Sequence, residues 1–299
     1  MSEPGSSPGA ARHALAITLC TLIWGSTFLF ISIGNDTVPP MWAATLRLAI
    51  AAAVMVALVL GRGRALPTGP ALKAAMWYGL FQFGLNLPLL YWGQRVVPSG
   101  LAAVVYATVP ISSALIARLF GIERLVPLKM LGALVALGGV AILFTEQLAA
   151  RVTALPLLAI FAATVLAALG STLLKRGPRQ DPLGANAVAA TVGIPFCLAA
   201  SLLRHESRTL PTQWVQIYPI LYLALAGSVV AFVSFAWLLQ HWKVSTVAFI
   251  GVVVPVIAVA LGVWVRAESF RREHALGSLL VLAGVGLAII SDRRRSRSA

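Results

Sequence analysis

Long, nearly uncharged apolar runs constrain this chain more than any motif does. A helix that crosses the hydrocarbon core of a bilayer needs about 20 mostly apolar residues. The 299-residue chain contains ten such runs, separated by short charged or Pro/Gly-containing breaks. The predicted spans are residues 14–33, 41–60, 71–91, 99–119, 126–144, 154–174, 184–203, 215–236, 245–265 and 274–291. Since the breaks leave no room for a soluble domain, we predict an all-α integral membrane protein with ten transmembrane helices.

The composition excludes a soluble globular protein. Only 11% of the residues are charged and 59% are apolar, whereas a soluble domain is about 25% charged. The net charge of +14 would indicate nucleic acid in a soluble protein, but here the basic residues are scattered between apolar runs. We therefore expect the lipid bilayer and a small-molecule substrate as partners, no nucleic acid, and a monomer or weak homo-oligomer.

The basic residues also predict the orientation in the membrane. With the N-terminus in the cytoplasm, 15 of the 23 Lys and Arg residues lie on the inner side and 7 on the outer side, while Arg47 lies within a span. Because Lys and Arg are enriched in cytoplasmic loops, both termini are predicted to be cytoplasmic. Residues 1–13 are then a disordered cytoplasmic tail, and residues 293–299 are a basic cytoplasmic tail.

The sequence indicates two copies of one unit. A shift of 145 residues places Gly25-Ser26-Thr27 on Gly170-Ser171-Thr172 and Pro110 on Pro255. The same shift matches Trp92 with Trp237, Glu123 with Glu268, Gly132 with Gly277 and Gly139 with Gly284. Residues 14–148 are therefore predicted as a first five-helix repeat and residues 149–292 as a second.

The odd number of spans in each copy has a structural consequence. The second copy must enter the membrane from the opposite side, so the copies are related by an axis in the membrane plane. Inverted repeats of this kind are typical of secondary transporters, with a binding site near the midplane between the halves. The sequence thus predicts a transporter that opens alternately to the two sides.

Several local motifs resemble a known family. The stretch Leu22-Ile23-Trp24-Gly25-Ser26-Thr27-Phe28, Arg47, Ala107-Thr108-Val109-Pro110 and Gly121-Ile122-Glu123-Arg124-Leu125 are similar to EamA-type members of the drug/metabolite transporter superfamily, most of all the YddG-type amino-acid exporters. The resemblance covers nearly the whole chain beyond residue 13, with Leu169 as a departure where the first copy has Trp24. It implies helices around a central cavity, an inner (plasma) membrane location of bacterial type, and export of neutral or aromatic amino acids.

The positions of the acidic residues and histidines narrow the chemistry. All nine Asp and Glu and all four His lie in tails or at span ends. Proton-coupled carriers commonly hold such a group within a span, and an intramembrane enzyme needs a nucleophile–base or metal set there. Cys20 and Cys197 lie inside apolar runs, outside any CxxC motif. We therefore predict that the protein is not an enzyme and has no metal ion or cofactor. We predict transport by alternating access, without a proton-carrying carboxylate inside the membrane.

Two alternatives to amino-acid export stay open at this stage. One is a carrier of another small metabolite, such as a sugar phosphate, a nucleoside or a drug. A phosphate carrier would want several basic residues facing the cavity, and only Arg47 is available. The other is a non-transporting helper subunit of the membrane.

Arg47 is the one charge predicted well inside a span, and it has two interpretations. An unpaired Arg at the centre of a spanning helix costs about 2.5–3.5 kcal/mol on insertion scales. Arg47 either faces the cavity and attracts a substrate carboxylate, or extends outward toward Pro39 and Pro40 and bonds helix-end carbonyls.

The third span carries a polar stripe. Tyr78, Gln82 and Asn86 recur every four residues, which predicts one helical face. Burying an amide without partners costs roughly 2–7 kcal/mol, so the stripe must face protein or water. It either lines the substrate cavity or holds neighbouring helices together.

The remaining candidates are aromatic, hydroxyl-bearing and proline residues deep in the spans. The predicted substrate-binding residues are Trp24, Ser26, Arg47, Tyr78, Gln82, Asn86, Tyr106, Thr108, Ser228 and Phe232. Pro110 and Pro255 are predicted as paired hinges, with static bends as the alternative. Gly132, Gly138, Gly139, Gly277, Gly284 and Gly286 are interpreted as close helix packing. Glu123 with Arg124, and Glu268 with Arg266, are candidate ion pairs closing the two faces.

Overall fold

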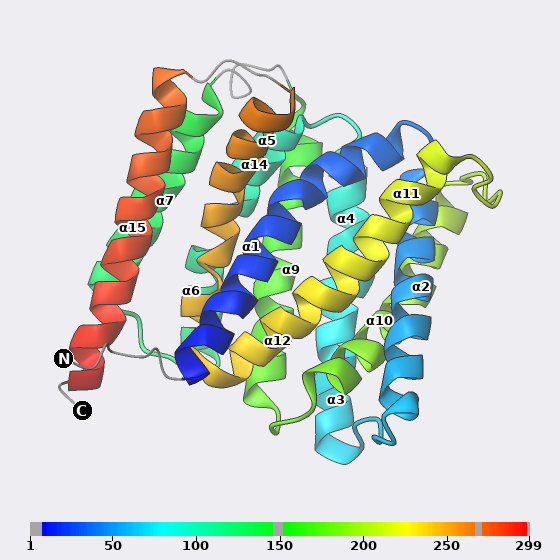
Figure 1. Ribbon diagram of the computed structural model, residues 1–299, viewed down its shortest axis with the longest axis horizontal. Coiled ribbons are helices and arrows are strands. Elements are labelled where there is room, and N and C mark those ends of the chain that lie inside the picture. Colours follow the sequence, from blue (N-terminus) through cyan, green and yellow to red (C-terminus); the bar gives the residue numbers. More distant parts are fainter. Residues whose placement is uncertain (1–7, 146–151, 267–270, 298–299) are drawn as a thin grey trace.

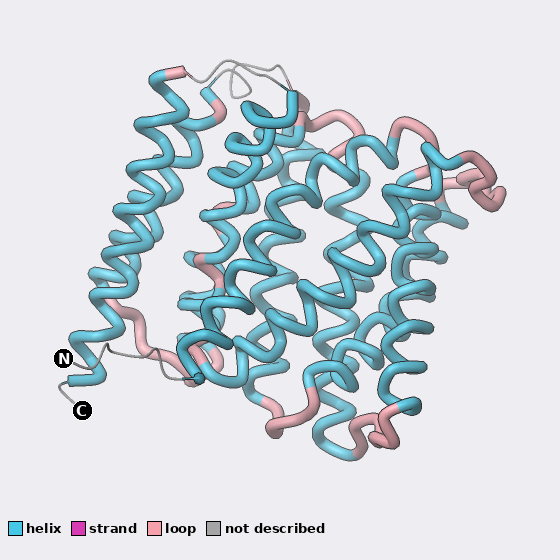
Figure 2. The backbone as a smooth tube through the Cα atoms, in the orientation of Figure 1, coloured by secondary structure: helices cyan, strands magenta, loops and turns pink. Residues whose placement is uncertain are grey.

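The computed structural model describes residues 8–145, 152–266 and 271–297, and every regular element within these ranges is a helix (Figures 1 and 2). Seven helices are long and apolar enough to cross a membrane, and Pro127–Leu143 and Val244–Ile257 are shorter apolar helices. The chain is an all-α membrane protein, as predicted.

The described chain forms five membrane segments in each repeat. The first repeat contains α1 (Pro8–Asn35), α2 (Pro40–Gly61), α3–η1–α4 (Gly69–Tyr78, Gly79–Leu85, Asn86–Gly93), α5–α6 (Ser99–Tyr106, Val109–Leu119) and α7 (Pro127–Leu143). The second contains α9 (Ala154–Arg176), α10 (Pro182–Leu203), α11–η2–α12 (Trp214–Tyr222, Leu223–Val230, Ala231–His241), α13–α14 (Val244–Val247, Ile250–Arg266) and α15 (Arg272–Arg297). Each predicted span coincides with one segment.

Two predicted tails are partly helical. α1 begins at Pro8 and α15 continues to Arg297, so residues 8–13 and 293–297 extend the terminal helices instead of forming coil. Proline is favoured in the first helical turn, where its missing N–H has no partner to lose. No Gly or Pro follows residue 291, so nothing in the sequence stops the last helix at the membrane surface. Residues 1–7 and 298–299 lie outside the described ranges.

The contact between α7 and α15, at the left edge of Figure 1, shows the inverted relation of the copies directly. A Cβ built on Gly139 would lie 2.7 Å from the carbonyl oxygen of Gly277, and a Cβ on Gly277 would lie 2.7 Å from that of Gly139. Gly132 and Gly284 are in the same reciprocal contact. Gly132 matches Gly277 and Gly139 matches Gly284 in the shifted sequence, so exchanging the two copies turns the Gly139–Gly277 contact into the Gly284–Gly132 contact. Such a pattern is the signature of a two-fold axis.

The pair α2 and α10 repeats this relation on the other side of the bundle. At one end, Glu206 from the α10–α11 loop accepts the backbone N–H of Trp42 at 3.0 Å, in the first turn of α2. At the opposite end, Asp181 caps the first turn of α10 through Gly184 N at 3.0 Å and pairs with Arg64 from the α2–α3 loop at 2.9 Å. The loop after α10 therefore binds the first turn of α2, and the loop after α2 binds the residue that caps α10.

Irregular backbone also recurs in matched places. The third segment of each repeat contains a π-helical stretch, Gly79–Leu85 in the first and Leu223–Val230 in the second. The fourth segment of each repeat is interrupted, at residues 107–108 and at residues 248–249. π-Helical stretches and broken helices in membrane proteins occur frequently at functional sites.

The two prolines predicted as equivalent hinges do not occupy equivalent positions. Pro110 lies in the first turn of α6, directly after the interruption, where its missing N–H is tolerated. Pro255 lies inside the continuous helix α14, and the interruption in that copy falls at Ala248 and Phe249. In both copies cavity-lining residues lie on either side of the interruption, whereas the two prolines differ in their distance from it. Their role as hinges stays a prediction.

The glycine contact yields a stability prediction. Gly139→Ala places a methyl group against backbone atoms of Gly277 and Val281, both 2.7 Å away. We expect about 1–3 kcal/mol of destabilisation, seen as a lower thermal midpoint of the purified protein. Gly138→Ala is the matched control, because its Cβ meets nothing within 4 Å. Equal midpoints for the two variants would contradict the close α7–α15 contact.

Candidate functional site

A central cavity lies between the two repeats. Its walls come from α1, α2, η1, α4, α5, α6 and α9, together with α12, α13 and α14. The empty space within it is about 850 Å³, part of which is open to solvent. Six of the ten predicted site residues line it: Trp24, Arg47, Gln82, Asn86, Tyr106 and Phe232.

Arg47 points into the bundle and not toward Pro39 and Pro40. Its residue is 1% exposed. Its Nε donates to Ser228 Oγ at 2.9 Å and its Nη1 donates to Tyr91 Oη at 3.3 Å. Within the described ranges, no carboxylate forms an ion pair with it. The guanidinium is therefore a buried, cavity-lining cation that is hydrogen-bonded to two hydroxyl groups.

Two amides of the third segment line the same cavity. Asn86 Nδ2 donates to Tyr106 Oη at 2.8 Å and to the carbonyl of Ala163 at 3.1 Å. Asn86 Oδ1 is buried and has no hydrogen-bond partner among the described atoms. Gln82 is 6% exposed and lines the cavity one turn away. A buried acceptor without a partner is the arrangement that a polar solute can complete.

Aromatic rings form the apolar wall. Trp24 meets Phe232 and Phe235 with ring centroids 5.1 Å apart in each case. Phe28 meets Tyr106 edge to face at 5.9 Å. Tilted and edge-to-face pairs at these separations are favourable aromatic geometries, so the wall is preorganised without a bound solute.

The other four predicted residues do not line the cavity. Tyr78 is fully buried against Phe83, because the π-helical stretch that begins at Gly79 turns fewer degrees per residue than an α-helix and breaks the predicted stripe. The three hydroxyl-bearing residues bond within the bundle instead. Ser26 bonds Ile23 O and Tyr222 Oη, Thr108 bonds Val105 O and Thr164 Oγ1, and Ser228 bonds Leu223 O while accepting from Arg47.

The analysis of the sequence missed several cavity-lining residues. Ser113 and Ser171 contribute hydroxyls, and Phe235 contributes a ring. Ser171 is the counterpart of Ser26 in the shifted sequence, so the repeat could have pointed to it. Ser113 carries no comparable signal, since one hydroxyl in an apolar helix usually bonds its own backbone.

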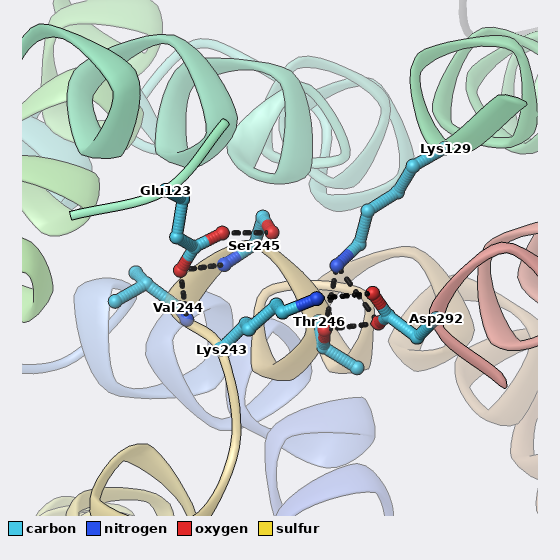
Figure 3. Close-up of polar contacts among 7 residues, drawn as sticks. All are labelled: Glu123, Lys129, Lys243, Val244, Ser245, Thr246 and Asp292. Carbon is cyan, nitrogen blue, oxygen red and sulfur yellow. Dashed lines mark hydrogen bonds and ion pairs between the residues drawn. The ribbon is translucent and has the colours of Figure 1, made fainter. Parts of the chain in front are cut away.

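A polar cluster lies next to the cavity at one end of the bundle (Figure 3). Glu123 accepts the backbone N–H of Val244 at 2.6 Å and the hydroxyl of Ser245. Asp292 accepts from Lys129 at 2.9 Å, Lys243 at 3.1 Å and Thr246 at 2.6 Å. Because Val244 also lines the cavity, these bonds tie the two repeats together between the cavity and the end that carries both termini.

The predicted ion pairs at the two faces have different outcomes. No Glu123–Arg124 pair is present among the described residues, since Glu123 binds the start of α13 instead. A helix start offers free N–H groups and a positive dipole end, which bind a carboxylate without an arginine. The Glu268–Arg266 prediction falls on residue 268, outside the described ranges. No group of three His, Cys, Asp or Glu that could hold a metal ion occurs in the described part of the chain.

Comparison with known proteins gives consistent matches over nearly the whole chain. Residues 12–145 and 154–290 each match the EamA-like transporter family. The "Uncharacterized inner membrane transporter YedA" of Escherichia coli (strain K12) is 29% identical over 90% of this chain and 88% of its own length. The "Probable amino-acid metabolite efflux pump" of Salmonella typhimurium is 27% identical over 93% of this chain and 94% of its own.

Two further matches extend this picture. The "Probable terminal-alkyne amino-acid exporter" of Streptantibioticus cattleyicolor is 28% identical over 97% of both chains. A solved crystal structure shares the fold with a TM-score of 0.78 at 20% identity, covering 95% of this chain and 98% of its own.

The cavity predicts a labelling pattern. In a Cys20→Ala/Cys197→Ala background, Ser171→Cys places a thiol on the cavity wall, whereas Ser201→Cys places one at a fully buried position away from it. We expect a water-soluble thiol reagent to modify the first at least about tenfold faster, since thiol reactivity follows exposure. The substitutions are nearly isosteric, so folding is preserved in both. Equal modification rates in the folded protein would contradict a water-accessible cavity at Ser171.

Proposed function

This chain belongs to the EamA-like transporter family, and we propose that it exports neutral amino acids, those with large or aromatic side chains included, across a bacterial-type inner membrane. Transport proceeds by alternating access of the central cavity between the two repeats. Members of the matched family are multi-pass transporters, and the relative from Escherichia coli is an inner membrane transporter by its name. The substrate class and the direction of transport are the proposed parts.

The observation that carries the proposal is the buried guanidinium of Arg47. Among the described residues, only two of its five N–H donors have partners, at Ser228 and Tyr91. A Cβ on Gly227 would lie 3.3 Å from Nη2, so the glycine lets the guanidinium pack closely against the backbone of η2. A substrate carboxylate at Arg47 would form charge-assisted, bidentate bonds and offset the cost of the buried charge.

The rest of the cavity suits the other parts of an amino acid. The unpaired Asn86 Oδ1 and the neighbouring Gln82 amide supply acceptors for an ammonium group. Trp24, Phe232 and Phe235 offer an aromatic wall for an apolar side chain. A phosphate-bearing substrate fits less well, because Arg47 is the only basic residue among the described cavity-lining side chains.

The named functions of relatives support the same substrate class. Two relatives, at 27% and 28% identity over more than nine-tenths of the chain, carry names that refer to amino-acid efflux or export. Export as the direction rests on these names. The cytoplasmic placement of both termini rests on the charge bias, and it puts the Glu123–Asp292 cluster at the cytoplasmic border of the cavity.

The first test is counterflow in liposomes that contain the purified protein and unlabelled amino acids. We expect accumulation of a labelled aromatic amino acid that needs internal solute but no proton gradient. Arg47→Gln should weaken transport of the amino acid about 10–100-fold, the range of a hydrogen bond to a charged group, and should change transport of the corresponding amide much less. Tyr91→Phe is the control, because it removes one bond to Arg47 and keeps the charge.

Two results would contradict the proposal. One is equal loss of acid and amide transport in Arg47→Gln, which would give Arg47 a purely structural role. The other is an absence of flux for every amino acid tested with protein shown to be folded.

The polar cluster predicts a conformational effect. Glu123→Gln weakens the bonds to Val244 and Ser245, so the cavity should open more often toward the termini. With Ser171→Cys as reporter, we expect labelling from that side to rise about tenfold, the effect of losing a bond to a charged group. Arg124→Gln is the matched control, since Arg124 is exposed and forms no ion pair among the described residues. No difference between the two variants would exclude the cluster as a closure.

A further inference from the structure

A second hollow lies on the outer face of the bundle, apart from the central cavity. It runs between α1, the start of α10 and α12, and it reaches the α2–α3 loop. None of its lining residues lines the central cavity. It lies at the end of the molecule from which α1 starts and at which α12 ends (Figure 1). We call it the α1–α12 groove.

The groove has an excess of positive charge. Arg12, Arg62 and Arg64 line it together with one acid, Asp181. Asp181 is already paired with Arg64 at 2.9 Å and also accepts the N–H of Gly184. Arg12 and Arg62 are exposed, and neither guanidinium has a hydrogen bond or ion pair in the described part of the chain. Two guanidinium groups are therefore available to an anion, and guanidinium is the side-chain group best matched to phosphate oxygens.

Most of the remaining wall is apolar. Leu15 lines the groove with 59% of its surface exposed, and Leu19 and Val233 continue the wall. Trp237, also in the groove, contacts the ring of His13 at 4.8 Å and that of His241 at 4.3 Å. Aromatic side chains gather at the interface between headgroups and acyl chains. The arginines thus lie at headgroup level, and the leucines extend from there into the acyl-chain region.

We propose that the α1–α12 groove binds an anionic phospholipid. The arginines take the phosphate-bearing headgroup, and an acyl chain lies along Leu15 and Leu19. Basic pockets between membrane helices on the cytoplasmic side are suited to anionic lipid headgroups. A soluble phosphate would use the same arginines but would gain nothing from the exposed leucines.

The position of the groove gives this lipid a link to both repeats. Arg12 and Arg62 belong to the first repeat, whereas Val233 and Trp237 belong to the second. Alternating access moves one repeat against the other, so a lipid that contacts both repeats favours the conformation in which the groove has its present shape.

Native mass spectrometry of the full chain in detergent tests the proposal, with phosphatidylglycerol and phosphatidylcholine of identical acyl chains as probes. We expect wild-type protein to retain phosphatidylglycerol in preference. At about 1 kcal/mol per basic residue, Arg12→Gln/Arg62→Gln should lower that preference about 30-fold. Arg118→Gln/Arg124→Gln is the matched control: both arginines are exposed, the charge change is the same, and neither lines the groove.

A third variant separates a lipid from a soluble anion. Leu15→Ser removes apolar wall and leaves the arginines, so it should reduce retention of phosphatidylglycerol and have no effect on inorganic phosphate. The proposal is overturned if the control pair loses as much lipid as the groove pair. It is also overturned if inorganic phosphate competes with the lipid at equal concentration, or if the two lipids are retained equally. Because the readout is binding, the result does not depend on which solute the protein transports.

Discussion

Lipid leaves no water to satisfy backbone N–H and C=O groups, and this one constraint organises the structure. A spanning segment must close its hydrogen bonds within itself, so irregular backbone is tolerated only where protein or a water-filled space covers it. Here the irregular stretches gather around the central cavity. The stretch 79–85 carries Gln82, and the stretch 223–230 carries the Ser228 that binds Arg47. Tyr106 precedes the first interruption, Ala248 lies in the second, and both line the cavity. The irregular backbone that would be costly in contact with lipid therefore lies around the cavity.

The scaffold is nearly symmetric, but the site is not. Gly132, Gly139, Gly277 and Gly284 form reciprocal contacts, as an in-plane two-fold axis requires. The cavity breaks that symmetry: Trp24 lines it, whereas the counterpart position is Leu169, and Ser171 lines it, whereas its counterpart Ser26 bonds Tyr222. The helical scaffold therefore repeats between the halves, whereas the side chains that line the cavity do not.

Some polar contacts between the repeats lie inside the bundle, such as Arg47 with Ser228 and Ser26 with Tyr222, and others lie at its ends. Glu206 at α2, Asp181 with Arg64, and the Glu123 and Asp292 clusters each join the two halves near a surface. The Arg64–Asp181 pair is exposed and contributes modestly to stability, whereas Lys129 is buried where it pairs with Asp292. The interior contacts between α7 and α15 are apolar and close, and they suit a part of the scaffold that stays together.

The sequence by itself determined the membrane location, the ten segments, the duplication and its inversion, because length and apolarity of a segment follow from bilayer thickness and an odd span count follows from arithmetic. It also identified six cavity residues, since deep polar and aromatic side chains in a span need an internal partner. Only the tertiary structure decided that Arg47 turns inward to Ser228 and Tyr91, that Tyr78 leaves the stripe, and that Glu123 binds α13 and not Arg124. These outcomes depend on which atoms of other segments lie within about 3 Å, the range of a hydrogen bond, and spacing along one helix carries no information about that.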